Sequence, residues 1–549
     1  MAPKRIGLDS SRTARAKPSA PPSDEDRLQV LVAALFVAAA LVFACWLSWQ
    51  RFLDLDELEH LNGAYFLSQG ERLYGTFFEN HPPGQALLLQ PVVRLAPDAF
   101  HMIDFGRALS FALSLLSLGC VAALARRLAG PCAALLAPLL LLTHSIYLAK
   151  TIEVRPDVAA TLCLAAALLL LARGVESERT RASAMGAGLL ALGMLFTPKI
   201  VYASAGAMVG ALLAHWDSHS YGAGPDSASR ERGRAKGRRR ALAHLGAMAL
   251  GGLGVAAVAL SLLQWTGSLE GFFSDVIAAN LEISVGEVGG FLALYGAELL
   301  VDNGPSTFLG LAGMVILYRS RATLRSGPQH SGPQYGLQYG LQYVLLASFG
   351  FALAGLFHLQ APLRQYYMSF LPQLCIAAAV ALLAVHHWLL TRVHQRARRQ
   401  VPTALSALLL AALLAVTVAP AVSRSLNQYG TQDQQRRRLA KVLELTRPGD
   451  RVFDCWSGTY LSRLPAFYFF YLNYDIQPIV PPARLRDELP QRLLAPDVRV
   501  AIWDSHCAAL PPAVHRVVAR HYRAVAGYPL LRVRRADGGA SAGGSQRPE

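Results

Sequence analysis

Stretches of about 20 mainly apolar residues recur along the chain, and this feature restricts the folds open to it more than any other. A helix of that length crosses the roughly 30 Å hydrocarbon core of a bilayer. By this criterion we count about eleven spans. They cover approximately residues 28–49, 105–124, 131–149, 156–172, 184–197, 200–216, 241–263, 306–318, 342–359, 366–389 and 403–422. Since only 16% of the residues are charged, we predict a mainly α-helical, polytopic membrane protein.

Basic residues lie in alternate connections between these spans, beginning with the polar segment 1–27. The other basic connections are at 126–127, 173–181, 230–240, 319–325 and 392–399. Cytoplasmic loops are enriched in Lys and Arg, and a topology of about eleven spans puts all these segments on one side. We therefore predict a cytoplasmic N-terminus in the inner (plasma) membrane of a bacterium, the source being inferred from the Ala-, Leu- and Arg-rich composition. Topology then explains the net charge of +16, and we expect no nucleic-acid partner.

This topology divides the chain into regions. Residues 1–27 form the cytoplasmic segment, 28–422 the transmembrane domain with a first outer loop at 50–104, 423–535 an extracytoplasmic domain, and 536–549 a disordered tail rich in Gly and Ser. Expected helices at 436–445 and 512–521 alternate with expected strands at 451–456, 498–503 and 528–533, which indicates a small α/β domain. Cys455 and Cys507 lie in this polar region, and the sequence is compatible with either a disulfide or two free thiols.

The first outer loop carries carboxylates at Asp54, Asp56, Glu57 and Glu59, directly after the first span. Such charges repel one another beside a low-dielectric layer, which favours a bound cation or a basic partner. The alternative is a solvated loop whose charges only keep it out of the bilayer.

Further outer connections place charged side chains at the membrane edge. These are Lys150, Glu153, Arg155 and Asp157 around Pro156, then Lys199 after Pro198, and Arg364 before Tyr366. Taken singly, Asp157 is compatible with a helix cap, and Lys199 and Arg364 with snorkelling anchors. Taken together, carboxylates and cations at the lipid boundary suit a phosphate-bearing lipid and a hydroxyl that must lose a proton.

The first outer loop also resembles a known signature. The residues Asp56-Glu57, Gly70, Tyr74 and Asn80-His81-Pro82-Pro83 look like the first loop of the GT-C membrane glycosyltransferases. The similar branch contains dolichyl-phosphate-mannose protein mannosyltransferases and bacterial aminoarabinose transferases. Arg107, residues 153–157, Thr197-Pro198-Lys199 and residues 364–367 follow in the expected order, so the resemblance covers about residues 28–420. The spacing of Arg364, Gln365 and Tyr366 departs from the family pattern, in which the aromatic directly follows the arginine.

This resemblance implies a GT-C-like transmembrane domain and an inverting glycosyltransferase. Such an enzyme moves a hexosyl or pentosyl group from a polyprenyl-phosphate carrier to a hydroxyl or amine of a lipid, glycan or protein, outside the cytoplasm. It would assign Asp56 as the general base and Asp157 as a group that orients the acceptor. Glu57 would support Asp56 or, together with Asp56, bind Mg²⁺ or Mn²⁺. The residues expected to bind the lipid phosphate are His81, Lys199, Arg364 and Tyr366.

Two other interpretations stay open. A transporter or flippase of a lipid-linked saccharide would also have many spans and charges near the lipid, although we see no duplicated halves with broken helices. An O-antigen ligase or polymerase is a second alternative, but the large functional loop of such enzymes lies in the middle or late part of the chain. The sequence names neither the sugar nor the acceptor.

Overall fold

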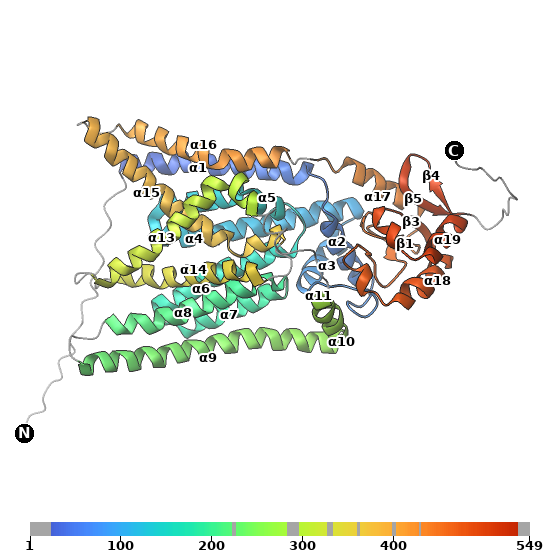
Figure 1. Cartoon of the computed structure of the whole chain (residues 1–549), viewed down its shortest axis with the longest axis horizontal. Helices are drawn as coiled ribbons and strands as arrows, with labels where there is room; N and C mark the ends of the chain where they lie inside the picture. Colours follow the sequence, from blue (N-terminus) through green and yellow to red (C-terminus); the bar gives the residue numbers. More distant parts are fainter. Residues whose placement is uncertain are drawn as a thin grey trace, which may run out of the picture.

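The computed structural model describes residues 23–221, 227–282, 296–326, 333–358, 363–397, 402–427 and 430–535. Long helices lie side by side in a bundle, and a small domain built on a sheet lies at one end of it (Figure 1). The predicted fold class, a mainly helical membrane protein with a small C-terminal α/β domain, is confirmed. Residues 1–22 of the expected cytoplasmic segment 1–27 and the whole expected tail 536–549 lie outside the described residues.

Each predicted apolar segment falls mainly within a helix of the bundle. These helices are α1 (Asp24–Gln50), α4 (Ala99–Thr143), α6 (Pro156–Ser177), α7 (Thr180–Met194), α8 (Val201–Tyr221), α9 (Ser227–Trp265), α13 (Gly304–Ser326), α14 (Pro333–His358), α15 (Leu371–Ala397) and α16 (Thr403–Asn427). Among the described residues, 7 helices are long and apolar enough to cross a membrane. This number is below the predicted one partly because α4 counts once and because α7 has only 15 residues.

A break divides α4 into the two segments that the sequence predicts. Gly130 has φ 83°, a left-handed conformation that glycine adopts without steric cost, and Pro131 follows it. Arg126 and Arg127 directly precede this break, as expected for a basic connection. Asp26 of α1 and His387 of α15 line one cavity together with Pro131, so three segments predicted to share a side of the membrane lie at the same end of the bundle.

Shorter elements gather at the other end of the bundle. They are α2 (Leu55–Ser68), α3 (Gly84–Leu95), α5 (Ser145–Thr151), η1 (Pro198–Ile200), α10 (Leu269–Gly271), η2 (Phe272–Ala278), α11 (Ala279–Glu282), η3 (Glu298–Asp302) and η4 (Arg364–Ser369). Most of them come from connections that the topology assigns to one side, whereas α5 and η4 overlap the ends of the predicted spans 131–149 and 366–389.

The C-terminal domain contains a five-stranded sheet in the order β2-β1-β3-β5-β4. Its elements are α17 (Asp433–Leu445), β1 (Arg451–Asp454), β2 (Leu464–Pro465), η5 (Gln477–Ile479), η6 (Arg484–Glu488), α18 (Leu489–Leu494), β3 (Val498–Ile502), η7 (Ser505–Ala509), α19 (Pro512–His521), β4 (Tyr522–Val525) and β5 (Tyr528–Arg534). Strand β1 pairs in parallel with β2 and β3, whereas β5 is antiparallel to β3 and β4. The three strands expected from the sequence are present, and β2 and β4 are additional.

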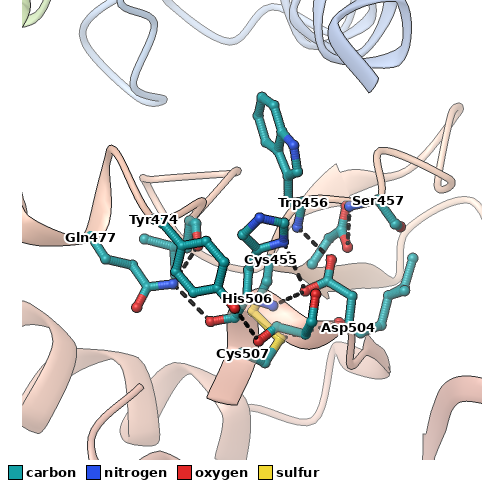
Figure 2. The surroundings of a disulfide bond; sticks show 12 residues. Cys455, Trp456, Ser457, Tyr474, Gln477, Asp504, His506 and Cys507 are labelled. Atoms are coloured by element: carbon teal, nitrogen blue, oxygen red, sulfur yellow. Dashed lines mark hydrogen bonds and ion pairs between the residues drawn. A yellow bond between two sulfur atoms is a disulfide. The ribbon is translucent and has the colours of Figure 1, made fainter. Parts of the chain in front are cut away.

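A disulfide joins Cys455, just after β1, to Cys507, after β3, with an S–S distance of 2.05 Å (Figure 2). Next to it, the carboxylate of Asp504 accepts hydrogen bonds from the backbone N–H groups of Trp456 (3.0 Å) and His506 (2.9 Å). The structure thus resolves the alternative that the sequence left open for these two cysteines.

The C-terminal domain packs on the first outer loop. Phe66 and Phe77 of this loop contact Phe470 with ring centroids 5.1 and 5.9 Å apart. Polar contacts join the same surfaces, because the side chain of Asn62 donates to Gly458 O (3.0 Å) and the Tyr471 hydroxyl donates to Asn80 Oδ1 (2.8 Å). The outer loop is therefore fixed between the helix bundle and the C-terminal domain.

Candidate active site

The acidic segment forms the first turn of α2, and a local interaction explains two of its carboxylates. Asp54 is the N-cap, and its side chain accepts a hydrogen bond from the N–H of Asp56 (3.1 Å). In return, Glu57 accepts a hydrogen bond from the N–H of Asp54 (2.9 Å). This capping box satisfies N–H groups that have no partner within the helix, and it fixes the direction in which Asp56 leaves the backbone.

Glu57 is fully buried and is held by Arg107 of α4. The Arg107 guanidinium donates to both carboxylate oxygens, at 2.9 Å from Nε and 2.7 Å from Nη2. Oε2 also accepts from the N–H of Val154 at 3.1 Å. With the N–H of Asp54, these donors fill the roughly four acceptor positions of a carboxylate. The contacts of Glu57, which was expected to support the base or to help hold a cation, thus join α2 to α4.

Asp56 points the other way, toward Arg155. Its Oδ2 lies 2.5 Å from Arg155 Nη1, and its side chain stays 30% exposed. Burial alone would raise the pKa of Asp56, but the charges of Arg155 and Lys150 lower it to well below its usual range. Asp56 is consequently an ionised carboxylate that solvent can reach.

Arg155 links Asp56 to the remaining predicted residues. Its Nε lies 3.3 Å from Asp157 Oδ2, and the other oxygen of Asp157 lies 3.3 Å from Lys199 Nζ. Lys199 in turn lies over the ring of Tyr366, 5.3 Å from its centroid. Asp56, Asp157, Lys199 and Tyr366, which are far apart in the sequence, are thus joined in one network of charges.

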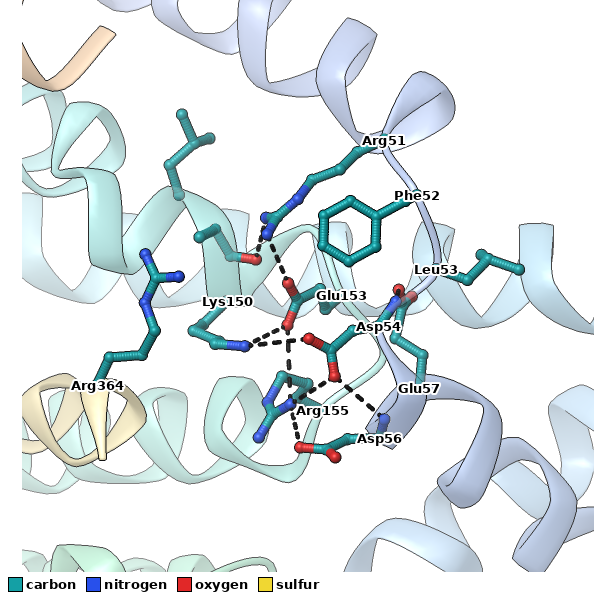
Figure 3. Close-up of polar contacts among 12 residues, drawn as sticks. Arg51, Phe52, Leu53, Asp54, Asp56, Glu57, Lys150, Glu153, Arg155 and Arg364 are labelled. Carbon is teal, nitrogen blue, oxygen red and sulfur yellow. Dashed lines mark hydrogen bonds and ion pairs between the residues drawn. The ribbon is translucent and has the colours of Figure 1, made fainter. Parts of the chain in front are cut away.

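A second group of ion pairs, centred on Glu153, adjoins Arg155 and belongs to the same network. Lys150 Nζ contacts Glu153 at 2.8 Å and Asp54 at 3.5 Å. Arg51, at the end of α1, contacts the other oxygen of Glu153 at 3.1 Å. Figure 3 shows these side chains converging from α1, α2 and the connection between α5 and α6. Because cations and carboxylates alternate, each buried charge has a partner of opposite sign, as a buried charge requires.

Arg364 and His81 lie outside this network. Arg364 pairs with Glu298 of η3, and Figure 3 shows it on the opposite side of Lys150 from Asp56. His81 lies 2.7 Å from Glu79 and 3.3 Å from Glu59 through its Nδ1 atom. Burial would lower the pKa of His81, but its pairing with these two carboxylates raises it to about 10. Both cations, expected at the lipid phosphate, already have carboxylate partners.

Arg155 is the main residue that the sequence-based prediction of the site omitted. Arg155 lies two residues before the predicted Asp157. The alternating charges of Lys150, Glu153, Arg155 and Asp157 could have indicated that it belongs to the site.

The exposed members of the network define what it can do. Asp56 is 30%, Asp54 23% and Lys199 14% exposed, whereas Arg155 and Asp157 are almost completely buried. A substrate therefore meets an ionised carboxylate, which can accept a proton, and an ammonium group, which can pair with an anion. Burial lowers the pKa of Lys199, and the neighbouring Asp157 partly offsets this effect.

Known proteins share the fold of this chain. Residues 80–221 match the family model described as dolichyl-phosphate-mannose-protein mannosyltransferase. The structure is similar to that of ArnT from Cupriavidus metallidurans, both in its apo state and bound to undecaprenyl phosphate, with a TM-score of 0.55 and 15% identity over 91% of this chain and 97% of ArnT. It is also similar to the archaeal oligosaccharyltransferase AglB from Archaeoglobus fulgidus, in complex with an inhibitory peptide and a dolichol-phosphate, with a TM-score of 0.51 and 12% identity over 92% of this chain and 75% of AglB. No curated protein matches the sequence.

Proposed function

We propose that this chain, which has the fold of the GT-C membrane glycosyltransferases, transfers a sugar from a polyprenyl-phosphate carrier to a hydroxyl or amine acceptor. One observation carries the proposal: a partly exposed, ionised carboxylate and a partly exposed ammonium group belong to one largely buried network at the end of the bundle. A phosphate is already a good leaving group, so such an enzyme needs little more than a proton acceptor and a positive charge for the departing phosphate.

In the proposed reaction Asp56 is the general base. The acceptor hydroxyl gives its proton to Asp56, the acceptor oxygen forms a bond to the anomeric carbon, and the bond from that carbon to the phosphate breaks with its electron pair on the phosphate. A single displacement of this kind inverts the anomeric centre. In the structure Asp56 contacts Arg155, so the acceptor must take over part of this contact before the proton moves.

Lys199 and Tyr366 are proposed to meet the lipid phosphate. Lys199 is the most accessible cation of the network and lies against the ring of Tyr366 at the level of η4. Asp157 is held by Arg155 and Lys199 and is buried, so we assign it to positioning Lys199 rather than to orienting the acceptor, as first expected. Arg155 places a positive charge beside Asp56, at the position where the sequence suggested a divalent cation.

We further propose that the reaction takes place outside the cytoplasm, in a bacterial plasma membrane. The basic connections lie at the opposite end of the bundle from the acidic network, and the positive-inside rule assigns that end to the cytoplasm. The disulfide between Cys455 and Cys507 supports this orientation, since disulfides persist in oxidising compartments.

The proposal can be tested without knowing the sugar. Mass spectrometry would compare envelope lipids and glycans from cells that express the wild-type chain, Asp56→Asn or Glu71→Gln. Glu71 is an acid of the same outer loop that pairs with Arg451 outside the network. We expect a mass difference of one sugar in the wild type and in Glu71→Gln, and a transfer rate about 10²–10⁴-fold lower in Asp56→Asn. Full transfer by Asp56→Asn would exclude Asp56 as the base.

A further inference from the structure

A second cluster of titratable side chains lies one turn further along α2, separate from the ion-pair network. It consists of Glu59 and His60 from α2 and of Glu79 and His81 from the segment before α3. Each residue offers one ligand atom, and these atoms all lie within 4.8 Å of one another. Glu59, His60 and Glu79 are at least 96% buried.

Two polar atoms of this cluster are left without hydrogen bonds. Glu59 Oε1 and His60 Nε2 are buried and have no hydrogen-bond partner, although Glu59 Oε1 lies 3.3 Å from His81 Nδ1. A buried polar atom without a hydrogen bond lowers the free energy of unfolding by about 1–3 kcal/mol, so such atoms indicate a position where a ligand binds. The rings of His60 and His81 lie close together as well, with centroids 4.8 Å apart.

The backbone brings the two halves of the cluster together. Gly63 lies one turn after Glu59, and a Cβ atom at this position would already contact Glu79 Oε2 at 3.4 Å. The Tyr74 hydroxyl donates to the carbonyl of His81 (2.7 Å), which fixes the segment opposite α2. Glu59 also lines a small cavity between α2 and the C-terminal domain.

We propose that Glu59, His60, Glu79 and His81 bind one Zn²⁺ ion. Two imidazoles and two carboxylates are a ligand set that zinc accepts in tetrahedral sites. Bonds of about 2.0–2.2 Å put tetrahedral ligand atoms about 3.4 Å apart, so modest side-chain rotations would close the site. Zinc would replace the proton that His81 holds between Glu59 and Glu79, and this proton would leave to solvent.

The ion would join α2 to the segment that carries Glu79 and His81. Asn80, between these two ligands, contacts Tyr471 of the C-terminal domain, so the same ion would also stabilise the packing of that domain. This site is distinct from the expected position of a metal at Asp56 and Glu57, and it does not depend on the proposed transfer reaction.

Metal analysis of the full-length chain in detergent tests the proposal. Protein stripped with a chelator, loaded with Zn²⁺ and desalted should retain about one equivalent. Loading with Co²⁺ instead should give the visible absorption bands of a tetrahedral site. Either wild-type protein without retained zinc or cobalt bands of an octahedral, fully hydrated ion would overturn the proposal.

Variants locate the ion. Glu59→Gln and His60→Gln should each weaken zinc binding at least about tenfold, as loss of a ligand exceeds the usual effect of an outer partner. His101→Gln is the control, because His101 pairs with Asp98 at an exposed site away from the cluster and should keep wild-type affinity. Unchanged zinc affinity in both cluster variants would contradict the assignment. Because no donor is needed, these results are independent of whether the chain transfers a sugar.

Discussion

Asp56 and Glu57 are adjacent in sequence and identical in charge, yet they have opposite environments. Successive residues on a helix point about 100° apart, so one carboxylate faces Arg155 near solvent and the other faces Arg107 in the interior. The different roles that we propose for them therefore follow from the side of α2 on which each lies.

The first prediction separates these roles. Glu57→Gln leaves the Arg107 guanidinium buried without its charge partner, and removing one member of a buried pair costs about 3–5 kcal/mol. We expect a clearly lower melting temperature in detergent for Glu57→Gln, but little change for Asp56→Asn, whose side chain is partly exposed. Equal melting temperatures of Glu57→Gln and the wild type would contradict the structural role.

The second prediction concerns the pH dependence of transfer. Lys199 must be protonated to pair with a phosphate, and burial lowers its pKa, so it loses its proton at a lower pH than an ordinary lysine. On the alkaline side, kcat/KM for the donor should therefore fall before the pH range in which free lysines titrate. In Lys199→Arg the charge persists, and the alkaline decline should move to higher pH. Identical profiles for both proteins would exclude Lys199 as the group that titrates.

At the scale of elements, glycines let helices of the bundle approach closely. Helix α9 packs along α7 and α8, although only 6% of the residues in its most apolar window are buried. Gly251 lies where α9 approaches α7 closely, because a Cβ atom there would lie 2.0 Å from the carbonyl oxygen of Ala184 in α7. Small residues at such positions are typical of helix packing in membranes.

The third prediction uses two glycines of this helix. Gly251→Leu should force α9 away from α7 and lower the melting temperature by several degrees. Gly254→Leu is the matched control, since a Cβ atom at Gly254 meets nothing within 4 Å. Thermal unfolding of both variants, followed by tryptophan fluorescence, checks this expectation. A larger loss of stability in Gly254→Leu than in Gly251→Leu would refute it.

At the scale of the whole molecule, the two ends of the bundle carry different charged segments. The ion-pair network and the C-terminal domain lie at one end, and the basic connections lie at the other (Figure 1). An enzyme that takes its donor from a membrane lipid needs its polar site at this boundary between lipid and water.

The fourth prediction tests the orientation. In a chain whose free cysteines are replaced by alanine, Arg520→Cys in α19 should react with a membrane-impermeant maleimide in cells with a permeable outer envelope. Glu231→Cys, exposed near the start of α9, should react only after the inner membrane is opened. The reverse pattern would place the network in the cytoplasm.

The sequence by itself determined the membrane helices and their shared ends. Length and hydropathy decide whether a segment crosses a bilayer, and these are local properties of the chain. It also determined three strands of the C-terminal domain and the identity of the acidic segment at the start of α2. The acidic segment stood out beside the first span, and the resemblance to the GT-C glycosyltransferases singled out Asp56 within it.

Only the tertiary structure decided which charges meet. Glu57 pairs with Arg107, 50 residues away, and Arg364 pairs with Glu298, 66 residues away. A charge is structural when its partners bury it and reactive when solvent reaches it, and neither property can be read from neighbours in sequence. The acidic loop of the sequence thus becomes an anchor at Glu57, a candidate base at Asp56, and a proposed zinc ligand at Glu59.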